Sequence, residues 1–72
     1  MDAVIALGEP ALLEGYALAG AVVRAAGTDD EVRRAWAQAR DARVVILTPR
    51  AARVLGAALD DPHAPLTAVL PS

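Results

Sequence analysis

Short apolar runs alternate along the chain with longer segments in which apolar residues recur at helical spacing. The apolar runs cover residues 3–7, 21–23 (continuing at most to Ala25), 43–47 and 66–70. Val, Ile and Leu dominate these runs and hardly alternate with polar residues, which is typical of strands that are covered on both faces in a parallel sheet. The pattern therefore predicts four buried strands separated by three helices.

Each helical segment opens with a recognisable start signal. Pro10 suits the first turn of a helix because it has no N–H to lose there. Thr28-Asp29-Asp30-Glu31 has the pattern of a capping box, with its acids at the positive end of the helix dipole. Thr48 and Pro49 supply an N-cap and a first residue for the third helix, and Asp60-Asp61-Pro62 should end it.

One face of each helix should pack against the sheet. Trp36 is the only Trp in a chain without Phe, so we expect it to be a main anchor of the core. Gly20 should end the first helix in a left-handed conformation, and Gly15 should let that helix approach the sheet closely. The predicted buried faces are Leu13, Tyr16, Ala17 and Gly20 in the first helix, Val32, Ala35, Trp36 and Ala39 in the second, and Ala51, Val54, Leu55 and Ala58 in the third.

A chain of 72 residues has room for one domain, residues 1–72, and for no second core. Strands joined by single helices favour right-handed crossovers and a parallel sheet. The expected fold is therefore α/β: a small open four-stranded parallel sheet in the order 2-1-3-4, with three helices in a three-layer sandwich like that of flavodoxins and receiver domains. The second and fourth strands would then be edge strands.

The composition excludes several classes of function. The net charge of −2 and the pI near 5.1 argue against general electrostatic binding of nucleic acid. Cys is absent, which rules out disulfides and thiolate metal sites, and Lys is absent, which rules out lysine chemistry. No apolar run reaches the roughly 18 residues of a membrane span, and Asp2 stands where a signal peptide would be positively charged. We therefore expect a soluble, intracellular domain that does not insert into a membrane.

Ligands of open α/β sheets bind beyond the carboxyl ends of the strands. After the first strand, Gly8 alone does not supply the glycine pattern of a dinucleotide site, and Glu9 would repel a phosphate. A P-loop requires a Lys, which this sequence lacks. A receiver domain requires a Lys and also a carboxylate at the end of the third strand, where this sequence has Thr48. The lone His63, which lies in a loop between prolines, should be at the surface. We therefore assign no catalytic, cofactor-binding or metal-binding residue, and no cofactor.

Two motifs make the chain resemble a known family. The first is Gly15-Tyr16-Ala17-Leu18-Ala19-Gly20, which follows the first strand, and the second is the ending Leu70-Pro71-Ser72. With the layout between them, they resemble the F subunit of the V-type (V/A-type) rotary ATPases and ATP synthases over essentially all 72 residues. Members of that family continue into a mostly helical C-terminal segment, whereas this sequence stops at Ser72, so the resemblance concerns the family's N-terminal domain.

The resemblance implies a non-catalytic component of the central stalk. Such a protein binds the coiled-coil D subunit of the stalk, forms part of the rotor, and helps to couple ATP turnover in the A/B head to proton or sodium transport through the membrane ring. It would lie in the cytoplasm, peripheral to the membrane. Tyr16, Arg50 and Arg53 are candidates for the partner interface. The family-motif residues, expected to be structural, are Gly15, Tyr16, Leu18, Ala19, Gly20, Pro71 and Ser72.

Two other interpretations stay open at this point. The domain could be a regulatory α/β module that binds a nucleotide or another small ligand at its strand ends. It could also be a degenerate receiver-like domain that serves as a platform for protein interactions. Because uncovered sheet edges invite pairing or packing by another chain, the two edge strands favour a function in protein binding.

Overall fold

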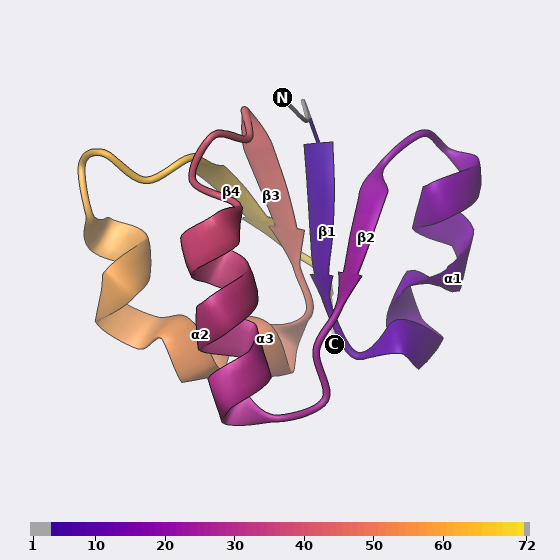
Figure 1. The fold of residues 1–72 in the computed structure, drawn as a ribbon, viewed down its shortest axis with the longest axis horizontal. Helices are drawn as coiled ribbons and strands as arrows, with labels where there is room; N and C mark the ends of the chain where they lie inside the picture. The colour runs from indigo at the N-terminus through magenta and orange to yellow at the C-terminus, as the bar shows by residue number, and fades with distance from the viewer. Residues whose placement is uncertain (1–3, 72) are drawn as a thin grey trace.

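The computed structural model describes residues 4–71, and a four-stranded parallel sheet organises them (Figure 1). The strand order β2-β1-β3-β4 confirms the predicted order. All three strand pairs are parallel. In chain order the elements are β1 (Val4–Gly8), α1 (Pro10–Leu18), β2 (Val22–Ala25), α2 (Asp29–Gln38), β3 (Val44–Leu47), α3 (Pro49–Leu55), the 3-10 helix η1 (Gly56–Asp60) and β4 (Leu66–Val69).

The topology distributes the helices over both faces of the sheet. Because β2 and β3 lie on opposite sides of β1, right-handed crossovers put α1 on one face and α2 and α3 on the other. In agreement, α1 contacts β1 and β2, whereas α2 and α3 pack against each other and against β1. Figure 1 shows α2 and α3 close together and α1 apart from them, beside β2. The result is the predicted three-layer arrangement.

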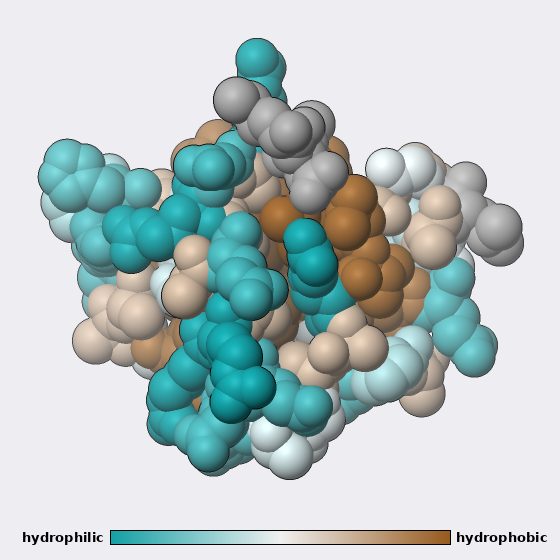
Figure 2. Space-filling model, viewed as in Figure 1, coloured by the Kyte–Doolittle hydropathy of each residue, from teal (hydrophilic) through white to brown (hydrophobic). Residues whose placement is uncertain are grey.

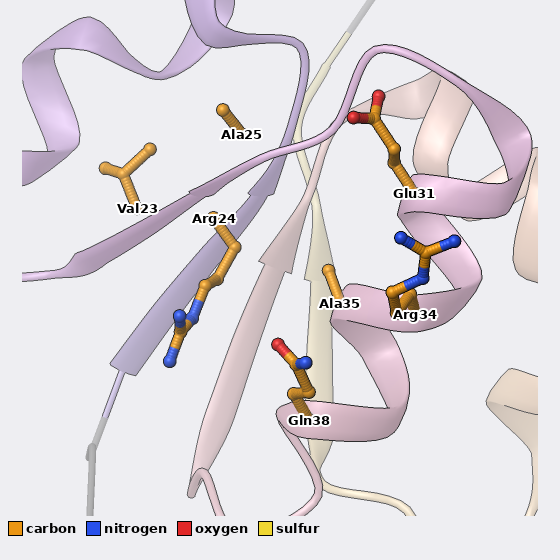
Figure 3. A pocket seen from close by; sticks show the side chains of 7 residues that line it. All are labelled: Val23, Arg24, Ala25, Glu31, Arg34, Ala35 and Gln38. Carbon is orange, nitrogen blue, oxygen red and sulfur yellow. The ribbon is translucent and has the colours of Figure 1, made fainter.

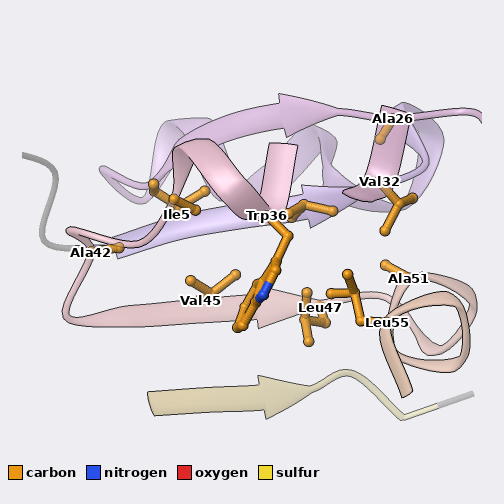
Figure 4. Packing of buried hydrophobic residues seen from close by; sticks show 11 residues of the cluster. Ile5, Ala26, Val32, Trp36, Ala42, Val45, Leu47, Ala51 and Leu55 are labelled. Carbon is orange, nitrogen blue, oxygen red and sulfur yellow. The ribbon is translucent and has the colours of Figure 1, made fainter. Parts of the chain in front are cut away.

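The main core lies between the sheet and the layer of α2 and α3. Ile5 and Leu7 of β1 and Val45 and Leu47 of β3 are buried and point to this layer. Trp36 of α2, only 7% exposed, packs among them (Figure 4). The predicted place of Trp36 in the core is thereby confirmed. A chain of this size buries little surface for each residue, so one large side chain contributes a substantial part of the core.

The predicted helix starts are confirmed. At α2, the hydroxyl of Thr28 accepts a hydrogen bond from the N–H of Glu31 at 3.2 Å. The Glu31 carboxylate in turn accepts from the N–H groups of Gly27 and Thr28 at 3.0 and 3.1 Å, which completes the capping box. At α3, the hydroxyl of Thr48 accepts from the N–H of Ala51 at 3.3 Å. These bonds satisfy backbone donors that have no partner within the helix.

The prediction that the last strand is covered on both faces is wrong. β4 is exposed along its whole length, with Leu66 75% and Val69 52% exposed. The α-helical part of α3 ends at Leu55, because Gly56 adopts a φ of 48° and the chain continues as η1. Ala58, predicted to extend the buried face of α3, is consequently exposed. An apolar run alone does not distinguish a buried strand from an apolar edge strand.

The predicted face of the first helix is only partly correct. Leu13 is buried and Tyr16 is half-buried, but Ala17 and Gly20 are exposed. Gly15 is also exposed, and a Cβ built on it would meet no atom within 4 Å. The expectation that Gly15 allows a close approach to the sheet is therefore wrong. Among residues 4–71, α1 is the one helix on this face of the sheet. A narrow stripe of side chains along α1 therefore suffices for its contact with the strands.

Candidate functional site

The carboxyl ends of β1 and β3 meet where the chain connections change direction, the usual ligand position of an open α/β sheet. Glu9 follows β1 directly and Thr48 follows β3. The hydroxyl of Thr48 donates a hydrogen bond to Oε1 of Glu9 at 2.6 Å while it caps α3. Thr48 is 0% exposed, so it fills the crevice between the two strand ends.

Gly8 makes this close approach feasible. Its φ is 151°, a conformation that other residues rarely adopt. A Cβ built on it would overlap the side chain of Thr48 and lie only 2.8 Å from Thr48 Cβ. The space in which a dinucleotide fold receives a pyrophosphate is thus occupied here by a threonine side chain.

The crevice carries the negative charge of the Glu9 carboxylate, which Thr48 holds in place. The hydrogen bond from Thr48 is the main reason why the pKa of Glu9 lies below its ordinary value of 4.5. Burial opposes this effect, and the charges of Arg50 and Arg53 lower the pKa further. Glu9 is therefore ionised near neutral pH. A carboxylate in this state repels a phosphate and has no proton to donate.

Arg50 connects a third loop, the one between β2 and α2, to the same carboxyl end of the sheet. One of its guanidinium nitrogens donates to the carbonyl oxygen of Gly27 at 2.8 Å, and the other lies 3.3 Å from Oδ1 of Asp29. The start of α3 is thereby tied to the loop between β2 and α2. From the sequence, Thr48 and Asp29 are predicted only as parts of helix starts. The contacts of Thr48 with Glu9 and of Arg50 with Asp29 are not predicted, although the strand order brings the three loops together.

Within residues 4–71, no group of His, Cys, Asp or Glu side chains is arranged to hold a metal ion. Nor does any helix of this range have the length and apolar character that a membrane crossing requires.

The motif of residues 15–20 forms the end of α1. The N–H of Ala21 donates to the carbonyl oxygen of Tyr16, and the N–H of Gly20 donates to that of Ala17, both at 3.1 Å. With Gly20 at a φ of 96°, these two bonds form a Schellman motif that stops the helix. The left-handed conformation predicted for Gly20 is confirmed, and this part of the motif has a structural explanation.

The three candidate interface residues do not form one patch. Tyr16 lies on α1, at the face of the sheet opposite to α3. Arg50 and Arg53 lie on α3, where Arg50 is engaged within the chain and Arg53 is exposed. Of the second motif, Pro71 is exposed just beyond β4, and Ser72 lies outside the described residues.

An exposed apolar surface lies on the side of the sheet that α1 covers only in part. Val44 pairs in register with Leu66, and Ile46 pairs with Ala68, so that these four side chains share one face. Ala6, which is in register with Ile46, is buried on this same face next to α1. We call Val44, Ile46, Leu66 and Ala68 the open half-face; Leu66 and Ala68 are exposed and the two residues of β3 are half-buried.

Comparison with known proteins does not assign the chain to a family. No protein-family model matches the sequence, and no curated protein matches it significantly.

Proposed function

We propose that the chain is a non-catalytic rotor component of a V/A-type rotary ATPase or ATP synthase, corresponding to the N-terminal domain of the F subunit. Its task is to bind the coiled-coil D subunit. The observation that carries this proposal is β4, which is exposed along its length and forms an edge of the sheet. The resemblance of the two sequence motifs supplies the identity of the partner.

The open half-face suits a helical partner. α1 covers β1 and β2 but leaves the residues of the open half-face at least partly exposed to solvent, so a helix placed there would complete the layer that α1 begins. All four residues are apolar, and burying apolar surface favours association by roughly 25 cal/mol for each Å². An amphipathic helix of a coiled coil presents an apolar stripe of the required kind.

The filled crevice at the strand ends is consistent with a function in which the domain serves as a rigid body. Thr48 and Arg50 fix three loops to one another where a small-ligand site would otherwise open. A rotor component transmits torque through contacts with its partner and needs no reactive group. In the proposed complex the domain acts in the cytoplasm, peripheral to the membrane, and reaches the A/B head and the membrane ring through the D subunit.

Co-expression with the D subunit tests the proposal. We expect a one-to-one complex that survives gel filtration and that Leu66→Glu disrupts. Leu12→Glu is the matched control, because Leu12 is an equally apolar residue of α1 that is 53% exposed and lies outside the open half-face. Two separate peaks at micromolar concentration would contradict the proposal, as would a rise in melting temperature with millimolar nucleotide or flavin.

A further inference from the structure

A second surface lies on the other side of the molecule, between β2 and α2. An open hollow of about 350 Å³ separates these elements (Figure 3). Figure 2 shows hydrophilic atoms over the region of α2 and exposed apolar atoms beside them, over β1 and β2. The hollow is lined by Val23, Arg24, Ala25, Glu31, Arg34, Ala35 and Gln38.

Two of the lining residues are arginines without a carboxylate partner. Among residues 4–71, Arg33, Arg40 and Arg50 each lie within 4.0 Å of a carboxylate, whereas Arg24 and Arg34 form no such pair. Figure 3 shows Arg24 on β2 and Arg34 on α2 bordering the same hollow. Guanidinium groups bind carboxylates in a bidentate geometry, so the hollow presents two unused sites of this kind.

The one carboxylate among the residues that line the hollow, that of Glu31, already has hydrogen-bond partners within the chain. Glu31 accepts hydrogen bonds from the N–H groups of Gly27 and Thr28 in the capping box. The charge of Arg34 acts on it only weakly, as the last of the causes that lower the pKa of Glu31. Two guanidinium groups and the amide of Gln38 therefore face one anchored acid, which leaves the hollow with a net positive charge.

The backbone of β2 adds donors and acceptors at the rim. The N–H of Ala26, which directly follows β2, donates to Gly8 in the neighbouring strand at 2.9 Å. Because backbone groups alternate in direction along a strand, the N–H groups of Val23 and Ala25 point away from β1, toward the unpaired edge. Both residues line the hollow, so its rim can pair with another extended chain.

We propose that this hollow binds an extended acidic segment of a partner protein, whose carboxylates pair with Arg24 and Arg34 while its backbone pairs with the edge of β2. A free phosphate fits less well, because Glu31 would repel a multiply charged anion and the hollow is open to solvent. The inference rests on the charges and the free edge of β2. It holds whether or not the chain binds the D subunit.

Fluorescence anisotropy with a labelled peptide of alternating Glu and Val tests this proposal. We expect saturable binding that weakens as salt is added. Arg24→Gln and Arg34→Gln should each lower the affinity about tenfold, as for the loss of one charged hydrogen bond. Arg43→Gln is the control, since Arg43 is exposed, precedes β3 and does not line the hollow, and its affinity should equal that of the unchanged protein.

Amide NMR spectra of the same samples distinguish the alternatives. Shifts at Val23 and Ala25 with the acidic peptide, and none with its Gln-Val counterpart or with inorganic phosphate, are the expected result. Binding that survives both arginine substitutions would overturn the proposal, and so would the absence of binding at millimolar peptide. Phosphate shifts without peptide binding would also overturn it and would indicate a site for a free anion.

Discussion

Thr48 and Glu9 join the ends of two neighbouring strands through a single hydrogen bond of 2.6 Å. The hydroxyl of Thr48 donates a hydrogen bond to the carboxylate of Glu9, and its oxygen accepts a hydrogen bond from the N–H of Ala51 in the first turn of α3. One buried residue therefore holds β1, β3 and α3 together at the place where a ligand site would otherwise open.

Replacing this threonine should measurably weaken the fold. Thr48→Val keeps the shape of the side chain but removes the helix cap and the bond to Glu9, so we expect the free energy of unfolding to fall by about 2 kcal/mol. Urea unfolding followed by the fluorescence of Trp36 measures this change. Thr67→Val, at an exposed position of β4, is the control and should change stability by less than about 0.5 kcal/mol. Equal effects of the two substitutions would contradict this role of Thr48.

Acid should destabilise the domain through its hydrogen-bonded carboxylates. The pKa values of Glu9 and Glu31 lie below the ordinary 4.5, because hydrogen bonds from Thr48 and from the N–H of Gly27, respectively, stabilise the ionised forms. Their contribution to stability is complete above about pH 4.5 and is lost as the pH falls through the folded-state values.

Thermal melts between neutral pH and pH 3 check this expectation. Glu9→Gln should make the melting temperature less dependent on pH in the acid range. The same substitution should change the pH dependence much less in a protein that already carries Thr48→Val. An unchanged acid slope in Glu9→Gln would show that the carboxylate is not the group that titrates.

A side chain at position 8 should be poorly tolerated. Gly8→Ala forces a Cβ into the space of Thr48 at a φ of 151°, so we expect a loss of about 3 kcal/mol or more. Circular dichroism during urea unfolding measures it. Gly27→Ala is the matched control, because its Cβ would meet only Glu31 Oε1 at an ordinary 3.7 Å. A Gly8→Ala protein as stable as Gly27→Ala would refute the close packing of this crevice.

The two glycines of the first motif should respond in opposite ways to alanine. Gly20→Ala places a Cβ at a φ of 96° and should cost about 1 kcal/mol. Gly15→Ala adds a better helix former at an exposed site with free space and should stabilise the domain by about 0.5–1 kcal/mol. Melting temperatures of the two variants decide this point, and a destabilising Gly15→Ala would indicate a packing role that the structure lacks.

Much of the fold could be predicted from the sequence because its signals are local. The capping box at Thr28, the Thr48–Pro49 start and the apolar runs each depend on a few consecutive residues, and the preference for right-handed crossovers then limits the possible topologies to a few. The exposure of β4 could not be predicted in this way. Whether a helix covers an apolar strand depends on the arrangement of the whole fold: α1 packs against β1 and β2, and β4 stays exposed.

The candidate site was less predictable for a similar reason. Thr48 and Glu9 are far apart in the sequence, and each has a sufficient local explanation, so neither suggests the other until the strand order puts them side by side. The pairing of Arg50 with Asp29 could not be predicted for the same reason. Arg24 and Arg34 could not be connected from the sequence, because a single arginine in a strand or on a helix is ordinary; only the fold brings both to one hollow.

Hydrogen exchange of the domain, alone and mixed with the D subunit, tests the proposed docking role most directly. Alone, the amides of Thr67 and Val69 should exchange fast, because the N–H of Leu70 points to β3 and theirs therefore point to the open edge. In the complex, the amides of β4 that pair with β3 should become more protected, because a helix bound on the open half-face stabilises this strand, while the amides around Gly8 and Thr48 stay unchanged. Unchanged exchange in β4, or new protection confined to the strand ends, would contradict the account.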